Sequence, residues 1–266
     1  RIENCLQKPS INTTLHHPYA VPERATPSSR VASFVKTCIR SDPEFEECSR
    51  DAVQQLFDAL GPGLPTIGLE PLDPLKIPKI RILQGDGPVN VNAALDNVTV
   101  TGFGKTEVLS SKVDSKTYSF HTKVRVPKIR IEGTYDLKGK ILLIPLVGRG
   151  LCWFEPSDMT IDIVSDVKLY NRDEFTFFNV TRAHVKYAIG GLQLRMNNLF
   201  DGIQSLEEST NNYLNANWRP VSESLRPILS KTIEDILIGF LHKLFNNLPG
   251  DYMIGDIKIE KDKQTN

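Results

Sequence analysis

The stretch that decides the fold runs from residue 200 to residue 248 and reads FDGIQSLEESTNNYLNANWRPVSESLRPILSKTIEDILIGFLHKLFNNL. Its apolar residues recur at steps of three and four, which is typical of an α-helix with one apolar face. About 45 residues of helix reach roughly 65 Å, longer than a small domain is wide. The sequence therefore predicts one very long helix that another part of the chain must cover. Its apolar face comprises Leu206, Tyr213, Leu214, Trp218, Val221, Leu225, Leu229, Ile233, Ile236, Phe240, Leu244 and Leu248.

Two prolines lie inside this pattern. Pro220 and Pro227 each remove a backbone hydrogen bond and crowd the preceding turn, so bends are expected there. The alternative is two helices with a short break near Pro220. Polar residues such as Glu207 and Lys231 interrupt the stretch too often for a membrane span, which needs about 20 mostly apolar residues. We therefore expect no stable membrane insertion.

From Ile77 to about Leu194 the apolar residues alternate with polar ones instead. Turn-forming residues punctuate this region at 85–88, 137–140, 170–173 and 190–191. The pattern predicts half-buried antiparallel strands, without helices long enough for parallel crossovers. A sheet that curls around one long helix leaves either an elongated apolar channel or a filled core. Periodicity alone leaves both possibilities open.

The N-terminal part has a different character. Residues 1–30 are rich in Pro, Ser and Thr and predict a mobile extension, whereas 32–39 and 46–60 are predicted to be helical. Residues 64–75 are apolar but rich in Pro and Gly, and we place them over one end of the long helix. The expected organisation is a single domain over residues 31–253, followed by a polar tail at 254–266.

Charge and motif content narrow the function classes. The 32 basic and 32 acidic residues balance, so no net field draws the chain to nucleic acid. Neither CxxC nor HxxxH is present, and no metal or cofactor is predicted. There is no GxSxG nucleophile motif, and His121, His184 and His242 fall in separate predicted elements. We assign no catalytic residue and expect a protein that is not an enzyme. An ester hydrolase is kept as an alternative.

Sequons and cysteines favour the secretory route. Three N-x-[ST] sequons predict glycosylation at Asn12, Asn97 and Asn179. Cys38 and Cys48 enclose a short loop with an Asp-Pro turn, and in an oxidising compartment this pair should form a disulfide. The remaining cysteines, Cys5 and Cys152, either pair with each other or stay free.

Five segments make the chain recognisable. LNANWRPV at 214–221, LRPI at 225–228 and LFNNLP at 244–249 resemble the C-terminal signature of the takeout and juvenile hormone-binding protein family, secreted insect carriers of small lipids. CIRSDP at 38–43 and GLEPLDPL at 68–75 resemble the same family in the expected order. The resemblance covers roughly residues 31–253.

The resemblance implies an α+β fold of the tubular lipid-binding (TULIP-like) type, in which a curved antiparallel sheet wraps a long bent helix around an apolar cavity. It also implies the Cys38–Cys48 disulfide and an extracellular location such as haemolymph. We further expect a monomer without a cofactor. The expected ligand is a small hydrophobic molecule, such as a juvenile hormone-like terpenoid, a fatty acid or another lipid, bound without chemistry.

Departures from the family pattern refine this expectation. The juvenile hormone-binding branch has a second disulfide in the sheet half, but Cys152 is the only cysteine after Cys48. The chain is therefore closer to the takeout branch, whose ligand need not be juvenile hormone. A bridge between Cys5 and Cys152 would tie the N-terminal extension to the body.

The family has no fixed polar motif for its ligand, so the candidate ligand-binding residues come from the apolar stripe and its expected sheet partners. For each of them, simple core packing is the alternative. A secreted interaction protein with a merely structural cavity is the alternative function. The candidates are Val221, Leu225, Leu229, Ile236 and Phe240 on the helix, with Tyr118, Phe120 and Phe177 on the sheet.

Overall fold

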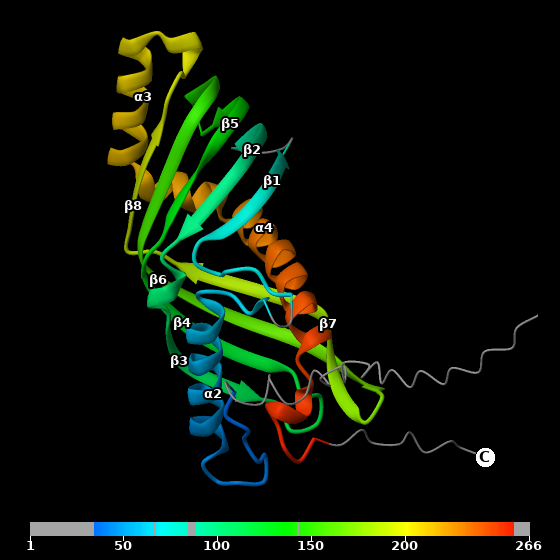
Figure 1. The fold of residues 1–266 in the computed structure, drawn as a ribbon. Helices are drawn as coiled ribbons and strands as arrows, with labels where there is room; N and C mark the ends of the chain where they lie inside the picture. Colours follow the sequence, from blue (N-terminus) through cyan, green and yellow to red (C-terminus); the bar gives the residue numbers. More distant parts are fainter. Residues whose placement is uncertain (1–34, 66–67, 85–88, 143, 258–266) are drawn as a thin grey trace, which may run out of the picture.

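The computed structural model describes residues 35–65, 68–84, 89–142 and 144–257. The expected N-terminal extension, with Cys5 and Asn12, lies outside these residues. The described chain forms one eight-stranded antiparallel sheet with helices α2, α3 and α4 (Figure 1). The strands are β1 (Leu75–Gln84), β2 (Val89–Thr101), β3 (Glu107–Val113), β4 (Phe120–Lys128), β5 (Arg130–Ile141), β6 (Ile144–Arg172), β7 (Phe175–Ala188) and β8 (Gly191–Met196).

Strand β6 connects two halves of the sheet. Its first part, through Phe154, pairs with β5 on one side, and residues 152–157 pair with β8 on the other. Its second part pairs with β4 and β7 instead. The upper half in Figure 1 is thus β8, β6, β5, β2 and β1, and the lower half is β7, β6, β4 and β3. The partners change around Asp158, which has a positive φ of 48°.

The expected antiparallel sheet is confirmed, with two local differences. Residues 137–140 lie inside β5, and the chain turns after Ile141 instead. The first part of β6 does not show clear alternation in sequence because Pro145, Gly148 and Gly150 interrupt it. It is nonetheless strand, since β5 supplies backbone partners from Ile141 to Ile131. Tertiary pairing overrides the weak local signal there.

The C-terminal stretch forms two α-helices and not one. Helix α3 spans Gln204–Ala216 and α4 spans Trp218–Asn247. The break is at Asn217, whose side-chain amide donates to the Tyr213 carbonyl and whose own carbonyl accepts from the Val221 N–H. Pro220 is the third residue of α4, where its missing N–H has no intrahelical partner to lose. The predicted continuous helix is therefore wrong, and the alternative of a break near Pro220 is correct.

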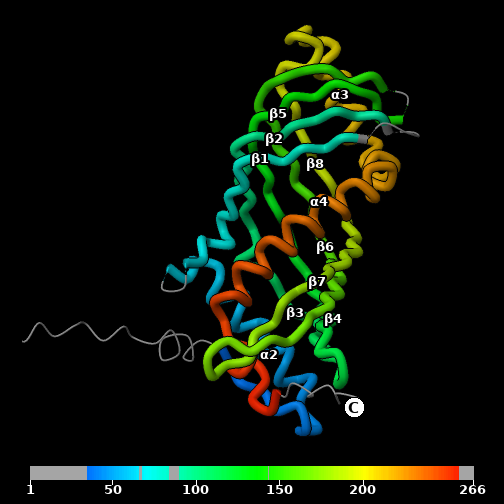
Figure 2. The backbone as a smooth tube through the Cα atoms, turned by 90° about the vertical axis from the view of Figure 1, so that its right-hand side faces the viewer, coloured from blue at the N-terminus to red at the C-terminus, as the bar shows by residue number. Residues whose placement is uncertain are grey.

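Helix α4 remains long, with 30 residues, and Pro227 lies inside it. It runs from the upper half of the sheet, below α3, to the lower end of the molecule (Figure 2). Over the part of the chain that the structure describes, no helix has both the length and the apolarity to cross a bilayer.

Helix α3 covers the outer edge of β8 through two asparagines. The Met196 N–H donates to Asn211 Oδ1 and Asn211 Nδ2 donates to the Met196 carbonyl, both at 2.9 Å. Asn215 makes the same pair of bonds with Leu194, also at 2.9 Å. Four residues of a helix rise about 6 Å, close to the rise of two residues of a strand. Asparagines four apart on α3 therefore meet strand residues two apart on β8. The asparagine amides thus replace a missing neighbouring strand.

Replacing Asn211 with alanine is expected to lower the free energy of unfolding by about 1–3 kcal/mol, because two buried backbone groups of Met196 lose their partner. Denaturant unfolding measures the change. The control is Asn212→Ala, one residue along α3 on the exposed side, which should stay within about 0.5 kcal/mol of the parent. Equal effects of the two substitutions would contradict this role of Asn211.

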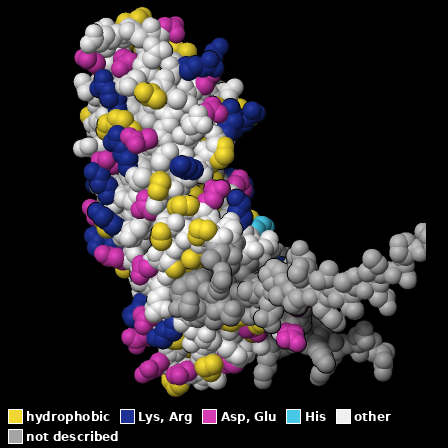
Figure 3. All heavy atoms as spheres, viewed as in Figure 1, with side chains coloured by type: hydrophobic (Ala, Val, Ile, Leu, Met, Phe, Trp, Pro, Cys, Tyr) yellow, Lys and Arg dark blue, Asp and Glu magenta, His cyan; other side chains and the backbone are white. Residues whose placement is uncertain are grey.

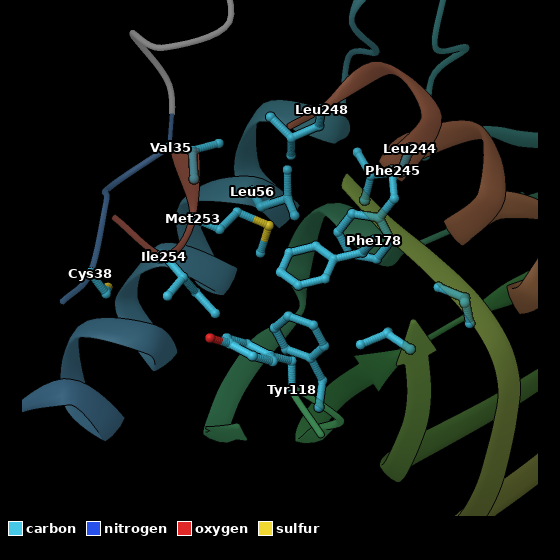
Figure 4. Packing of buried hydrophobic residues seen from close by; sticks show 14 of the residues in the cluster. Val35, Cys38, Leu56, Tyr118, Phe178, Leu244, Phe245, Leu248, Met253 and Ile254 are labelled. Atoms are coloured by element: carbon cyan, nitrogen blue, oxygen red, sulfur yellow. The ribbon is translucent and has the colours of Figure 1, made fainter. Parts of the chain in front are cut away.

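The lower end of the molecule holds a densely packed cluster, here called the lower cluster (Figure 4). Phe178 of β7 contacts Phe120 and Phe245, with ring centroids 5.2 and 5.4 Å apart. Helix α2 (Phe45–Leu60) contributes Leu56, and the Pro- and Gly-rich segment contributes Leu72. That segment therefore lies over one end of α4, as expected. Asp73 accepts hydrogen bonds from the Gly102 and Gly104 N–H groups and fixes the segment beside η2 (Phe103–Lys105).

The chain after α4 belongs to the body of the domain. Following η4 (Gly250–Tyr252), Ile254 is buried and pairs with Cys38, and Asp256 accepts from the backbone of Arg40. The body therefore extends beyond residue 253, where the sequence placed the start of the polar tail. The segment 35–39 is not helical, since Cys38 forms this isolated bridge.

Candidate functional site

The apolar stripe of α4 is buried at its two ends and more open in its middle. Val221 and Leu244 are each 2% exposed, and Leu248 is fully buried. Between them the stripe continues at steps of three and four, and every member is only half-buried. A filled core would bury the middle of a helix at least as well as its ends. The half-buried stripe comprises Leu225, Leu229, Ile233, Ile236 and Phe240.

The inner face of the sheet shows the same partial burial. Cross-strand pairing places Ile131, Phe154 and Leu194 side by side on one face. Leu194 and half-buried Phe154 belong to the cluster that also holds Leu225 of α4, here called the upper cluster. Both surfaces therefore keep apolar area that the packing of helix on sheet does not fully cover. Further half-buried residues of this face are Ile80, Ile82, Leu95 and Ile161.

Polar contacts fix α4 along one edge of the sheet. The Val185 N–H of β7 donates to Glu234 Oε1 at 2.9 Å, and His184 Nδ1 lies 2.8 Å from the same oxygen. Farther along, His242 Nε2 lies 2.6 Å from the Val180 carbonyl oxygen. These bonds hold α4 on β7 without using the apolar stripe, so the stripe stays available for another partner.

The structure separates the eight candidate ligand-binding residues into three places. Val221, Leu225, Leu229, Ile236 and Phe240 lie on the α4 stripe, with Val221 at its buried upper end. Tyr118 and Phe120 belong to the lower cluster. Phe177 packs against Tyr170, with ring centroids 5.6 Å apart, and under the Arg172 guanidinium, 3.9 Å from its ring.

The lower cluster is filled around Phe120. An enclosed space of only about 10 Å³ lies between Phe45, Val113 and Phe120, enough for about one water molecule. The lower end of α4 therefore has no room for a ligand, whereas the middle of its apolar stripe is only half-buried.

Two residues beside the α4 stripe were not among the candidates. Phe154 lies in the part of β6 whose alternation is masked by glycine and proline. Tyr187 of β7 is within an alternating apolar set, but its sequence does not show what its hydroxyl contacts. In the structure Tyr187 is 9% exposed, and its hydroxyl has no hydrogen-bond partner among the described residues. Burial raises the pKa of Tyr187, and the charge of Arg226 partly opposes that rise.

A second, more polar cavity lies outside this region. A groove of about 610 Å³ runs between α3 and the strands β6 and β8. Its lining includes Trp153 and Trp218, the two tryptophans of the chain, together with Gln193, Arg195 and Asn212. Lys and Arg side chains are interspersed with Asp and Glu on the face seen in Figure 3, so that face has no field of one sign.

The covalent features agree in part with the sequence. Cys38 and Cys48 form a disulfide, with Cα atoms 5.8 Å apart, which joins α2 to the strand-like segment that pairs with Ile254. Cys152 is buried and free, and burial raises the pKa of its thiol to about 11. Asn97 and Asn179 are exposed, as attachment of a glycan requires.

The histidines have separate partners. His121 contacts Asp162, His184 contacts Glu234 and His242 contacts a backbone carbonyl. In the described part of the chain, no three His, Cys, Asp or Glu residues gather closely enough to hold a metal ion.

Comparison with known proteins adds independent information. A family model described as haemolymph juvenile hormone binding protein matches residues 19–255. The circadian clock-controlled protein daywake of Drosophila yakuba is 24% identical over 87% of this chain and 91% of the relative. A putative β-carotene-binding protein of Schistocerca gregaria is 24% identical over 82% of this chain and 86% of that protein.

Among solved structures, Takeout 1 of Epiphyas postvittana superimposes with a TM-score of 0.72 at 21% identity, over 83% of this chain and 99% of that one. This likeness shows the shared fold, the tubular lipid-binding type in which a curved antiparallel sheet is combined with a long C-terminal helix.

Proposed function

Because the chain belongs to the haemolymph juvenile hormone binding protein family, we propose that it is a secreted carrier that binds one small hydrophobic molecule between α4 and the inner face of the sheet. The observation that carries the proposal is the half-buried α4 stripe. Leu225 and Phe240 of this stripe pack against the upper and lower clusters, and the stripe residues between them are half-buried and belong to neither cluster. An elongated, apolar site of this kind suits a long hydrophobic ligand.

The family relatives are consistent with the ligand class. The Schistocerca protein is named for binding a carotenoid, a long apolar molecule. We propose a terpenoid, a fatty acid or a similar lipid for this chain. The ligand is bound without a chemical step, and the candidate residues Leu225, Leu229, Ile236 and Phe240 contact it.

Secretion is the second part of the proposal. The disulfide between Cys38 and Cys48 requires an oxidising compartment in most organisms. The exposed sequon asparagines Asn97 and Asn179 would carry glycans there. Extracellular fluid such as haemolymph is the proposed location, and the protein acts as a monomer.

Native mass spectrometry of protein secreted from insect cells tests carriage directly. We expect a co-purified lipid of a few hundred daltons, released on denaturation, and displacement of the fluorescent hydrocarbon diphenylhexatriene by fatty acids or terpenoids. A protein that carries no such mass and binds no probe would contradict the carrier function. Turnover of an ester above the buffer blank would revive the hydrolase alternative.

One observation favours a second candidate function. The 610 Å³ groove is lined by two tryptophans and by the amide side chains of Gln193 and Asn212, and tryptophan is enriched in protein-binding surfaces. An interaction role would use this groove and would leave the interior space without ligand. The mass-spectrometry result separates the two functions, since only the carrier arrives with lipid.

A further inference from the structure

Tyr187 carries a polar group that the protein itself does not satisfy. The side chain is nine-tenths buried, and its hydroxyl lacks a hydrogen-bond partner among the described residues. Such buried unpaired groups are few in native proteins, because each costs free energy that a partner would recover. A specific explanation is therefore needed for this hydroxyl.

Two observations place Tyr187 beside the half-buried residues of the sheet and of α4. Its cross-strand partner is Ile161, one of the half-buried residues of the inner face. Its charge interaction with Arg226 places it near the first half of α4, where the half-buried stripe begins. Tyr187 belongs to none of the three packed clusters of the described chain, in contrast to Tyr118 and Tyr135.

Tyr135 shows what a satisfied buried tyrosine looks like in this fold. It is also buried, but its hydroxyl donates to the Asn197 carbonyl at 2.8 Å. The two tyrosines thus share burial and strand context and differ in whether the hydroxyl has a protein partner.

We propose that the Tyr187 hydroxyl donates a hydrogen bond to an oxygen atom of the bound ligand, so that the carrier selects oxygenated lipids, such as alcohols, esters and ketones, over pure hydrocarbons. This inference rests on the proposed carrier function. The phenol is protonated at neutral pH and offers one donor, and a lipid oxygen is the acceptor that completes it. The remainder of the ligand needs only apolar contact.

Matched ligands and matched variants test the proposal. Diphenylhexatriene, a hydrocarbon, serves as the displaced reporter, and 1-hexadecanol, methyl palmitate and hexadecane serve as competitors. Tyr187→Phe is expected to lower the affinity for the two oxygenated competitors by about fivefold to tenfold and to leave the affinity for hexadecane unchanged. Tyr135→Phe should not change the affinity for any competitor relative to the other two.

The ligand-free protein gives a second readout. Tyr187→Phe is expected to raise the melting temperature of the ligand-free protein by about 2–4 °C, because it removes an unpaired buried hydroxyl. Tyr135→Phe is expected to lower it, since the Asn197 carbonyl loses its donor.

The outcomes separate the anchor from the carrier function. If the reporter binds but Tyr187→Phe lowers the affinity for all competitors equally, or for none, the proposed hydrogen bond from Tyr187 is overturned and the carrier function stands. If Tyr187→Phe destabilises the ligand-free protein as Tyr135→Phe does, the hydroxyl already has a partner, such as a bound water, and the anchor is again overturned. A parent protein that binds neither reporter nor competitor removes both proposals.

Discussion

Replacing Ile236 with arginine is expected to weaken binding of an apolar ligand at least 100-fold while the protein still folds. Ile236 lies in the middle of the half-buried stripe, on the part of α4 that the proposed ligand covers. A ligand that covers this position would leave the guanidinium unpaired and dehydrated, which costs several kcal/mol. A 100-fold loss corresponds to about 2.8 kcal/mol, well within that cost. Displacement of diphenylhexatriene measures the affinity, and circular dichroism verifies the fold.

Two further variants make this prediction decisive. Glu223→Arg changes an exposed residue of the same helix and should leave the affinity unchanged. Ile236→Trp fills space without adding charge and should also weaken binding, which covers the case in which the arginine variant does not fold. Unchanged affinity in a folded Ile236→Trp protein would show that the ligand does not occupy the middle of α4.

The sequence predicts much of the fold because the helices and the strands each have their own spacing of apolar residues. The step of three and four along 204–247 gives the helices, and the alternation along β4 and β7 gives the strands, each from local pattern alone. The break at Asn217 escapes this reasoning because the apolar spacing passes through it without a change of phase. At this position the backbone N–H and the side-chain amide of Asn217 both donate to the Tyr213 carbonyl, a feature of local geometry that hydropathy does not encode.

The site was harder to predict than the fold for a related reason. Hydropathy identifies the α4 stripe, but it does not separate the closed ends at Val221 and Leu244 from the half-buried middle at Leu229 and Ile236. That distinction depends on how residues distant in sequence pack against each position, as Val221 does in the upper cluster and Leu244 in the lower cluster. Phe178 and Phe177 show the same limit, since they are adjacent and equally apolar. Only Phe178 joins the aromatic cluster with Phe120 and Phe245.

Replacing Phe178 with alanine is expected to lower the free energy of unfolding by about 3–5 kcal/mol, the largest stability effect anticipated for this chain. The ring is 1% exposed and contacts the rings of Phe120 and Phe245 edge to face. Its loss leaves a cavity where β7, β4 and the end of α4 meet. Hydrogen bonds to β6 hold β7 and β4 in place, so these elements cannot move together to fill the cavity. Guanidinium unfolding at 25 °C measures the change.

The matched variant for this prediction is Phe178→Leu, which retains most of the apolar volume and should cost less than about half as much. Because the lower cluster closes one end of the proposed ligand space, Phe178→Leu should bind diphenylhexatriene nearly as the parent does. Comparable destabilisation by the two substitutions would mean that the edge-to-face ring contacts, and not the filled volume, stabilise this end of the sheet. A loss below about 1 kcal/mol for Phe178→Ala would contradict the packed lower cluster itself and would move the boundary of the open interior toward residues 245–248.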